Sequence, residues 1–344
     1  MAYSALGESP IDKLVSQYFQ QVDPRDLDLP HGNAIVQPAV QRAVYERMFN
    51  ETALWPLPPV GYRARVLKII LTRIEESISN PEEDEILDDL MECWSDLLAQ
   101  PKPSSLQQAQ QLAYIKYTAP QLHSQVDQEC RTIITSESRG LILSSGTTGF
   151  RTWEAALHLG TFLSTPSGEA LVRGKKVLEL GAGTGFLSMF CAKYLGVHRI
   201  VVTDREQALI DSIQDCVVRN ELDQTTITPA TWEWGTPLEC CPPGSESFDV
   251  ALGADLIYDV DLVPLLISTL HDLFDNYHVK EFIISATLRN QDTFKVFLDS
   301  CYTNGFKVEC VPFESPSQDL QTGFFHSNSI PIQTYRISSQ KGLS

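Results

Sequence analysis

The stretch "VLELGAGTGF", Val177 to Phe186, decides the fold of this chain. An apolar run leads into Gly181, Gly183 and Gly185, and a helix-like run follows them. A strand, a glycine turn and a helix whose N-terminus points at a ligand form a common cofactor-binding arrangement. The pattern therefore predicts a bound cofactor at this turn, and the spacing of the glycines and their neighbours decides which one.

The glycine spacing separates three classes of cofactor. A nicotinamide dinucleotide motif, G-x-G-x-x-G, requires glycine where Phe186 stands, and a P-loop requires a Gly-Lys-Ser/Thr that this turn lacks. The remaining pattern, acid-x-G-x-G-x-G, is the form of the first motif in seven-strand S-adenosylmethionine methyltransferases. This cofactor has no phosphate, and its cationic amino group suits an acid such as Glu179. We predict S-adenosylmethionine, held by Glu179, Gly181, Gly183 and Gly185.

Acidic and aromatic residues stand at the ends of the next two predicted strands. "RIVVTDRE" places Asp204 at a carboxyl end, 19 residues after Gly185, where an acid can accept both hydroxyls of a ribose. "TWEWG" follows the third strand, so Glu233 or Trp234 is predicted to reach the adenine. Core packing is the alternative for Trp232 and Trp234, and we expect it for at least one of them.

The fourth predicted strand ends in "GADLIYD", which carries Ala254, Asp255 and Tyr258. These residues fall at the crevice where the order of strands reverses. Base-directed amino methyltransferases typically have two prolines inside this motif, whereas Asp-Leu-Ile-Tyr resembles the protein-lysine methyltransferase branch. We predict that Ala254 binds the cofactor and that Asp255 and Tyr258 are catalytic. Asp255 would orient the substrate ammonium and Tyr258 would shape the channel, with neither assigned as a general base.

Short apolar runs alternate with helical patterns after about residue 128. The predicted strands are "KKVLELG", "RIVVTD", "TTITPATWEW", "FDVALGADLIY", "EFIISATL", "FKVECVPF" and "IPIQTYRI". This alternation predicts an α/β fold, a mostly parallel seven-strand Rossmann-like sheet with an antiparallel pair at one edge. The methyltransferase domain is expected over 126–344, after a helical N-terminal domain over 1–125. "CRTIITSESRGLILSSG", 130–146, additionally suggests a hairpin.

The N-terminal region is helical in pattern, most clearly in "NPEEDEILDDLMECWSDLL", residues 80–98. Asn80 is the expected cap, Pro81 the first helical residue and Glu83 the partner in a capping box. Apolar residues then repeat at helical spacing, and the opposite face carries only acidic charges. A solvated surface and a docking face for a basic protein both remain open.

Composition limits the function classes. The 344 residues contain 26 basic and 44 acidic side chains, a formal charge of −18, which argues against direct nucleic-acid binding and favours a basic partner. Eight cysteines without a C-x-x-C pair indicate thiols in a reducing compartment and no metal site. No signal peptide and no membrane-spanning run is present in the sequence, so a cytoplasmic protein is expected.

The stretch "SSGTTGFRTWEAALHLGTFL", 144–163, combines G-T-T-G with T-W-x-A-A directly before the first strand. Together with "VLELGAGTG", "GADLIYD" and "ATLRNQDTFKVF" it resembles the eukaryotic elongation factor 2 lysine methyltransferases, over residues 130–344. The resemblance implies methyl transfer from S-adenosylmethionine to a lysine of elongation factor 2, by an enzyme expected to be a monomer. It also implies that Trp153 lies against the cofactor. Glu233 stands where relatives often have aspartate.

Other functions remain open at this stage. A lysine methyltransferase of another cytosolic protein, or a small-molecule or nucleic-acid methyltransferase, would keep the same cofactor residues. A non-enzymatic interaction protein with a vestigial fold would usually show decay in the glycine turn, which is intact here.

Overall fold

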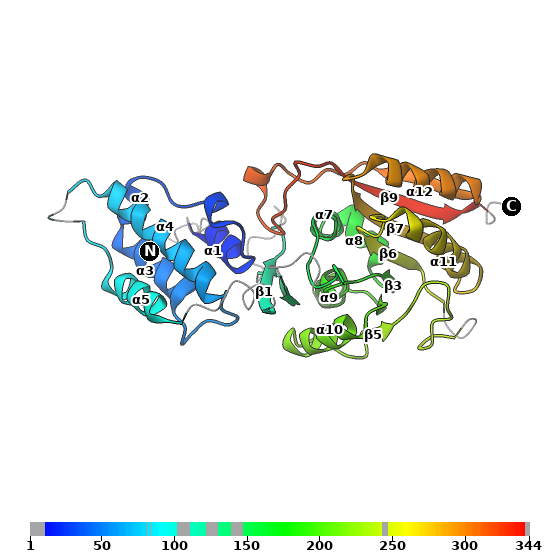
Figure 1. Cartoon of the computed structure of the whole chain (residues 1–344), viewed down its shortest axis with the longest axis horizontal. Coiled ribbons are helices and arrows are strands. Elements are labelled where there is room, and N and C mark those ends of the chain that lie inside the picture. Colours follow the sequence, from blue (N-terminus) through cyan, green and yellow to red (C-terminus); the bar gives the residue numbers. More distant parts are fainter. Residues whose placement is uncertain are drawn as a thin grey trace, which may run out of the picture. The chain divides into compact units, whose positions relative to one another are not determined.

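The computed structural model describes residues 11–80, 82, 84–101, 111–121, 130–138, 147–242 and 247–340. Within it the chain divides into two compact units, Met1–Thr118 and Ala119–Ser344. Figure 1 labels their helices and strands. None of the described helices is both long enough and apolar enough to cross a membrane.

The first unit is built mainly of helices around its own apolar core. Its longest helix, α4, buries Val66, Leu67, Ile70 and Ile74 at helical spacing, and Arg63 on the same helix pairs with Glu51. The described elements of this unit are α1 (Asp12–Phe19), a 3-10 turn (Pro24–Asp26), α2 (Asn33–Val36), α3 (Pro38–Val44), a π-helical turn (Tyr45–Phe49), α4 (Val60–Ser77), α5 (Asp88–Ala99) and β1 (Ala113–Thr118).

The helix predicted to start at Asn80 begins later, because α5 covers Asp88–Ala99. Pro81 and Glu83 of the expected capping box lie outside the described residues. Asn80 does accept the amide of Glu82 at 3.3 Å, but as part of a turn.

The physical reason for the late start is a buried glutamine from α3. Oε1 of Gln41 accepts the backbone amide of Leu87 at 2.8 Å, and its Nε2 donates to the carbonyl of Glu85 at 2.9 Å. These bonds satisfy the backbone of 85–87 in a non-helical conformation. A contact from more than forty residues away thus overrides the local helical pattern.

The second unit contains the predicted seven-strand sheet, in the order β5-β4-β3-β6-β7-β9-β8. The pairs from β5 to β7 are parallel, while β9 is antiparallel to both β7 and β8. The α/β fold and the antiparallel edge pair are therefore confirmed. The strands are β3 (Lys176–Leu180), β4 (Arg199–Asp204), β5 (Ile227–Thr231), β6 (Val250–Ala254), β7 (Glu281–Thr287), β8 (Phe306–Val311) and β9 (Ile332–Ser339).

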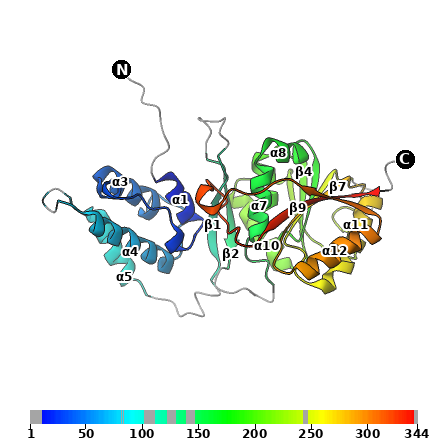
Figure 2. The same ribbon diagram turned by 90° about the horizontal axis from the view of Figure 1, so that it is seen from above.

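Helices cover both faces of this sheet, as the two views show (Figures 1 and 2). One face carries α7 (Glu154–Leu163), α9 (Phe186–Tyr194) and α10 (Gln207–Arg219). The other face carries α11 (Val263–Asp275) and α12 (Gln291–Thr303), whose apolar residues join those of β3, β6 and β7 in one core. The short helix α8 (Pro166–Val172) precedes β3.

The central strands are buried on both faces, which explains their nearly continuous apolar sequence. The order of strands reverses beside β3, because β4 lies on one side of it and β6 on the other. Side chains at the carboxyl ends of these strands therefore border one crevice. β2 (Thr132–Glu137) covers the first predicted strand of the hairpin expected at 130–146, but residues 139–146 lie outside the described ones, so the hairpin stays a prediction.

Candidate active site

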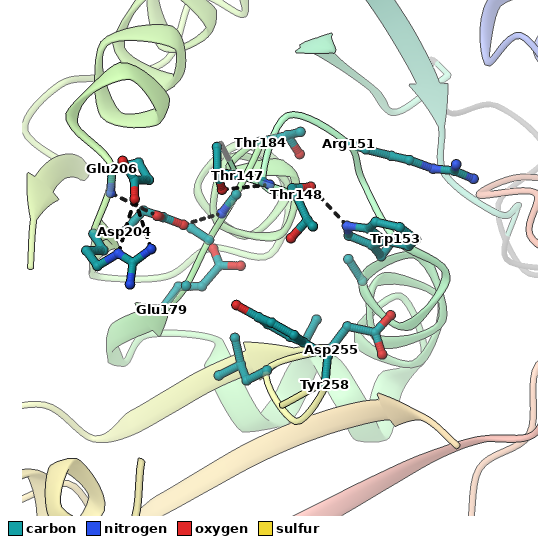
Figure 3. A pocket seen from close by; sticks show the side chains of 18 of the residues that line it. Thr147, Thr148, Arg151, Trp153, Glu179, Thr184, Asp204, Glu206, Asp255 and Tyr258 are labelled. Carbon is teal, nitrogen blue, oxygen red and sulfur yellow. Dashed lines mark hydrogen bonds and ion pairs between the residues drawn. The ribbon is translucent and has the colours of Figure 1, made fainter. Parts of the chain in front are cut away.

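A cavity of about 330 Å³ opens at the carboxyl ends of β3, β4, β5 and β6 (Figure 3). Its size falls in the range usual for small-molecule sites. Asp204 and Glu206 lie at one end and Trp153 at the other, with Asp255 and Tyr258 along one side. The predicted site residues that line the cavity are Trp153, Glu179, Gly181, Gly183, Asp204, Glu233, Trp234, Ala254, Asp255 and Tyr258.

Gly181 and Gly183 form the floor of the turn between β3 and α9, with φ angles of +57° and +56°. Side chains rarely adopt this left-handed conformation. A Cβ on Gly181 would also stand 2.7 Å from a methyl of Leu256, and one on Gly183 3.0 Å from the carbonyl oxygen of Gly149. The turn therefore brings bare backbone to the cavity.

Gly185, predicted to bind the cofactor, is not among the residues that line the cavity. It precedes α9 with a φ of +72°, and a Cβ there would stand 2.9 Å from Ile213 of α10. The structure gives this glycine a packing role, since it lets two helices approach closely.

Glu179 at the end of β3 is almost fully buried, yet it carries a carboxyl group. Its Oε2 accepts the backbone amide of Ser188 at 3.0 Å and also the hydroxyl of Ser188. Burial raises the pKa of Glu179 to about 8, although the bonds from Ser188 act in the opposite direction. A positive charge beside this carboxyl would stabilise its ionised form.

Asp204 at the end of β4 holds the glycine turn and borders the cavity. Its Oδ2 accepts the amide of Gly183 at 2.9 Å, and its Oδ1 accepts the amide of Glu206 at 3.2 Å. Burial raises the pKa of Asp204 above its ordinary value, and these amides lower it. The amide of Arg205 is a third donor to this carboxylate, which leaves about one acceptor position for a ligand hydroxyl.

The two tryptophans after β5 behave differently. Trp232 is 3% exposed within the core, and its indole donates to the carbonyl of Thr236 at 2.8 Å. Trp234 is only partly buried and lies near Gly181, whose Cβ position is 3.8 Å from its ring. Trp232 therefore meets the expectation that one of the pair packs in the core, although it also borders the cavity, as Trp234 and the exposed Glu233 do.

Asp255 follows β6 in the left-handed region, with a φ of +50°. Oδ1 of its carboxylate accepts the amide of Thr287 at 2.8 Å, and Oδ2 accepts the hydroxyl of Thr287 and the guanidinium of Arg289, both at 3.1 Å. Burial raises its pKa, and Thr287 and Arg289 act against that rise. Tyr258 stands at the mouth, 64% exposed.

Several lining residues were not in the predicted site. Thr147, Thr148 and Arg151 come from the segment before α7, and Arg289 follows β7. The indole of Trp153 donates to the carbonyl of Thr148 at 3.1 Å, which orients the ring. Arg289 belongs to the stretch "ATLRNQDTFKVF" that carries part of the resemblance, but its partners could not be read from spacing.

Comparison with known proteins gives consistent results. The model of the lysine methyltransferase family matches residues 142–303. Protein-lysine N-methyltransferase EFM3 of Chaetomium thermophilum is 42% identical over 318 residues, 91% of this chain and 94% of that protein. EFM3 of Saccharomyces cerevisiae is 31% identical over 288 residues, 77% of this chain and 79% of that protein.

A human relative matches a shorter part of the chain. Protein-lysine N-methyltransferase EEF2KMT of Homo sapiens is 26% identical over 199 residues, 53% of this chain and 58% of that protein.

Proposed function

The chain belongs to the lysine methyltransferase family and is a protein-lysine N-methyltransferase, and we propose that its substrate is a lysine of elongation factor 2. Methyl transfer to a lysine is supported by one cavity that combines cofactor-type residues with Asp255 and Tyr258 of the Asp-Leu-Ile-Tyr motif.

S-adenosylmethionine is the methyl donor, and the residues of the cavity fit it. When bound, it supplies an electrophilic methyl group on a sulfonium, which departs as a neutral thioether. We propose that Glu179 faces its ammonium, since a buried carboxyl with a raised pKa calls for a cation. Asp204 would accept one of its ribose hydroxyls, and Glu233 and Trp234 would contact its adenine. Trp153 would bound the site at the other end.

The substrate lysine must arrive at the cavity as a neutral amine. A free lysine has a pKa of about 10.4 and is protonated at neutral pH, so it has to lose a proton before its nitrogen can attack. Asp255 retains about one acceptor position beyond its three bonds, which suits an ammonium N–H. Asp255 would orient the ammonium while water takes the proton, and Tyr258 would narrow the entry.

Elongation factor 2 is supported by the resemblance in the T-W-x-A-A segment and by charge. A factor that contacts ribosomal RNA is expected to present basic surface, and this chain carries a formal charge of −18. On α5, the exposed Asp88, Glu92 and Asp96 follow one another at four-residue spacing and so form one acidic stripe. We propose that this stripe helps recruit the substrate, and that the enzyme acts as a cytoplasmic monomer.

The test is mass spectrometry of elongation factor 2 from cells with and without this protein. Loss of methylation at a lysine, restored by the wild-type chain and not by Asp255→Ala, is the expected result. An unchanged set of methylated lysines would remove elongation factor 2 as the substrate. Incubation of the purified chain with labelled cofactor and the unmethylated factor then separates direct transfer from an indirect effect.

A further inference from the structure

Arg289, in the segment after β7, joins two acidic residues from different elements at the side of the cavity. Its Nη1 donates to Oδ2 of Asp255 at 3.1 Å, and its Nη2 pairs with Glu154, the first residue of α7. The three residues are more than thirty positions apart in the chain. Arg289 thereby ties the Asp-Leu-Ile-Tyr segment to the helix that follows Trp153.

Two arginines share the neighbourhood of Trp153, and only one of them bonds to Asp255. The guanidinium carbons of Arg151 and Arg289 lie 4.9 and 5.0 Å from the centre of the Trp153 ring. Arg151 also approaches Glu154, with Nη2 and Oε1 3.7 Å apart. In the described part of the chain, Asp255 has an ion pair with Arg289 and none with Arg151. Arg151 therefore serves as a control for Arg289, since it lies at a similar distance from the Trp153 ring and lacks the bond to Asp255.

A positively charged partner favours the ionised form of Asp255. Its side chain is only 9% exposed, and burial favours the neutral acid. Thr287 contributes two bonds from neutral donors, whereas Arg289 contributes the positive charge. A neutral carboxylic acid is a poorer acceptor for an ammonium than a carboxylate is.

We propose that Arg289 is a positioning residue, which keeps the Asp255 carboxylate ionised and turned so that its remaining acceptor position meets the substrate ammonium. The inference rests on the role proposed above for Asp255. Arg289 touches neither the amine nor the methyl group in this scheme and acts through Asp255 alone.

Loss of the guanidinium has a defined consequence for the pH dependence of turnover. Asp255 would bind a proton more readily, so a higher pH would be needed to ionise it, and the acidic limb of the rate profile would move upward. Other titratable and charged side chains border the same cavity, so the limb has to be assigned with Asp255→Asn. They are Arg151, Glu179, Asp204, Arg205, Glu206, Glu233 and Tyr258, and Glu154 pairs with Arg289 beside them.

The experiment compares Arg289→Gln, Arg289→Lys and Arg151→Gln in the full chain. Turnover and KM for a lysine-bearing protein substrate are measured from pH 6 to 9, and cofactor affinity by calorimetry. We expect Arg289→Gln to lower kcat several-fold at pH 7 and to move the acidic limb upward, with cofactor affinity within about threefold. Arg289→Lys keeps the charge and should recover most of kcat. Arg151→Gln should leave the limb in place.

An unmoved limb in Arg289→Gln, or an equal shift in Arg151→Gln, would overturn the inference. A substrate-free measurement separates it from the choice of substrate: the carbon-13 shift of the Asp255 carboxyl, assigned with Asp255→Asn and followed with pH. A higher titration midpoint in Arg289→Gln supports the inference even if elongation factor 2 proves not to be methylated, and an identical midpoint contradicts it. If Arg289→Gln does not fold, as judged by circular dichroism, Arg289→Met takes its place and should raise the midpoint in the same way. Glu154→Gln, which leaves the Arg289–Asp255 bond, should keep the wild-type midpoint, and an unchanged midpoint in Arg289→Met contradicts the inference.

Discussion

Asp204 at the end of β4 accepts the backbone amide of Gly183, in the turn after β3, at 2.9 Å. The two residues are 21 positions apart, and this bond joins the acid expected to hold a ribose to the glycine turn expected to pass under the same ligand. One side chain therefore both shapes the cavity and lines it.

Asp204→Ala should weaken binding of S-adenosylmethionine by roughly ten- to a hundredfold, since hydrogen bonds to a charged group are worth about 1.5–3 kcal/mol. Calorimetry measures the affinity. Asp211→Ala, on the exposed surface of α10, is the control and should bind as the wild type does. Equal affinity of the Asp204 and Asp211 variants would contradict a role for Asp204 in ligand binding.

Because the carboxyl of Glu179 is buried, we expect cofactor binding to release a proton near neutral pH. Burial raises its pKa to about 8, so the group is largely protonated at pH 7 without ligand, and a neighbouring ammonium would stabilise the ionised form. Affinity should therefore rise with pH from about 6 toward 8, because ionising Glu179 beforehand removes the cost of displacing its proton. Calorimetry in buffers of different ionisation enthalpy measures the proton count. Glu179→Gln should abolish this release; a variant that releases as much as the wild type would assign the proton to another group.

Trp153→Ala should reduce cofactor affinity by about 0.5–1.5 kcal/mol beyond the loss of buried area. The ring borders the cavity and is held by its bond to the carbonyl of Thr148. Trp153→Phe keeps an aromatic ring and loses the bond to Thr148, so its affinity for the cofactor should lie between those of the wild type and Trp153→Ala. Binding and thermal unfolding are measured together, with Trp55→Ala in the first unit as a control for stability. A change in melting temperature alone would leave Trp153 with a packing role.

Reversal of Asp88, Glu92 and Asp96 on α5 to lysine should raise KM for elongation factor 2, roughly three- to tenfold, with kcat nearly unchanged. The reason is weaker recruitment of a basic substrate by a stripe that takes no part in the chemistry. Steady-state kinetics at low ionic strength provides the measurement, since salt screens such effects. Reversal of Asp211, Asp275 and Asp299 gives the same change in net charge away from α5. Equal increases in KM from both sets of reversals would mean that the overall charge, and not the acidic stripe on α5, recruits the substrate.

Much of the fold was predictable because the second unit obeys local rules. Each of the seven apolar runs became a strand, and acids placed at strand ends met at one crevice because parallel strands end on the same edge. The start of α5 was not predictable, since the amide of Gln41, far away in sequence, bonds to the backbone at Glu85 and Leu87.

The residues of the cavity also divide into those that local sequence predicted and those whose contacts come from distant parts of the chain. Those inside the strand-end motifs were found, while Arg151 and the bonds of Arg289 were not. Arg289 meets Glu154 across 135 positions, and no periodicity or spacing reports a contact of that kind. Gly185 was assigned to the ligand because it fits the glycine pattern. In the structure, a side chain at this position would collide with Ile213 on a neighbouring helix, a contact that the pattern does not reveal.

The position of β9 between β7 and β8 has a consequence for biosynthesis, because β9 follows both strands in the chain. While the ribosome has released β8 and still holds β9, one edge of β7 presents unpaired amides and carbonyls. Such an edge is a template for pairing with other chains. Completion of this sheet must therefore wait until translation has passed Ser339, and that edge of β7 stays without its strand partner until then.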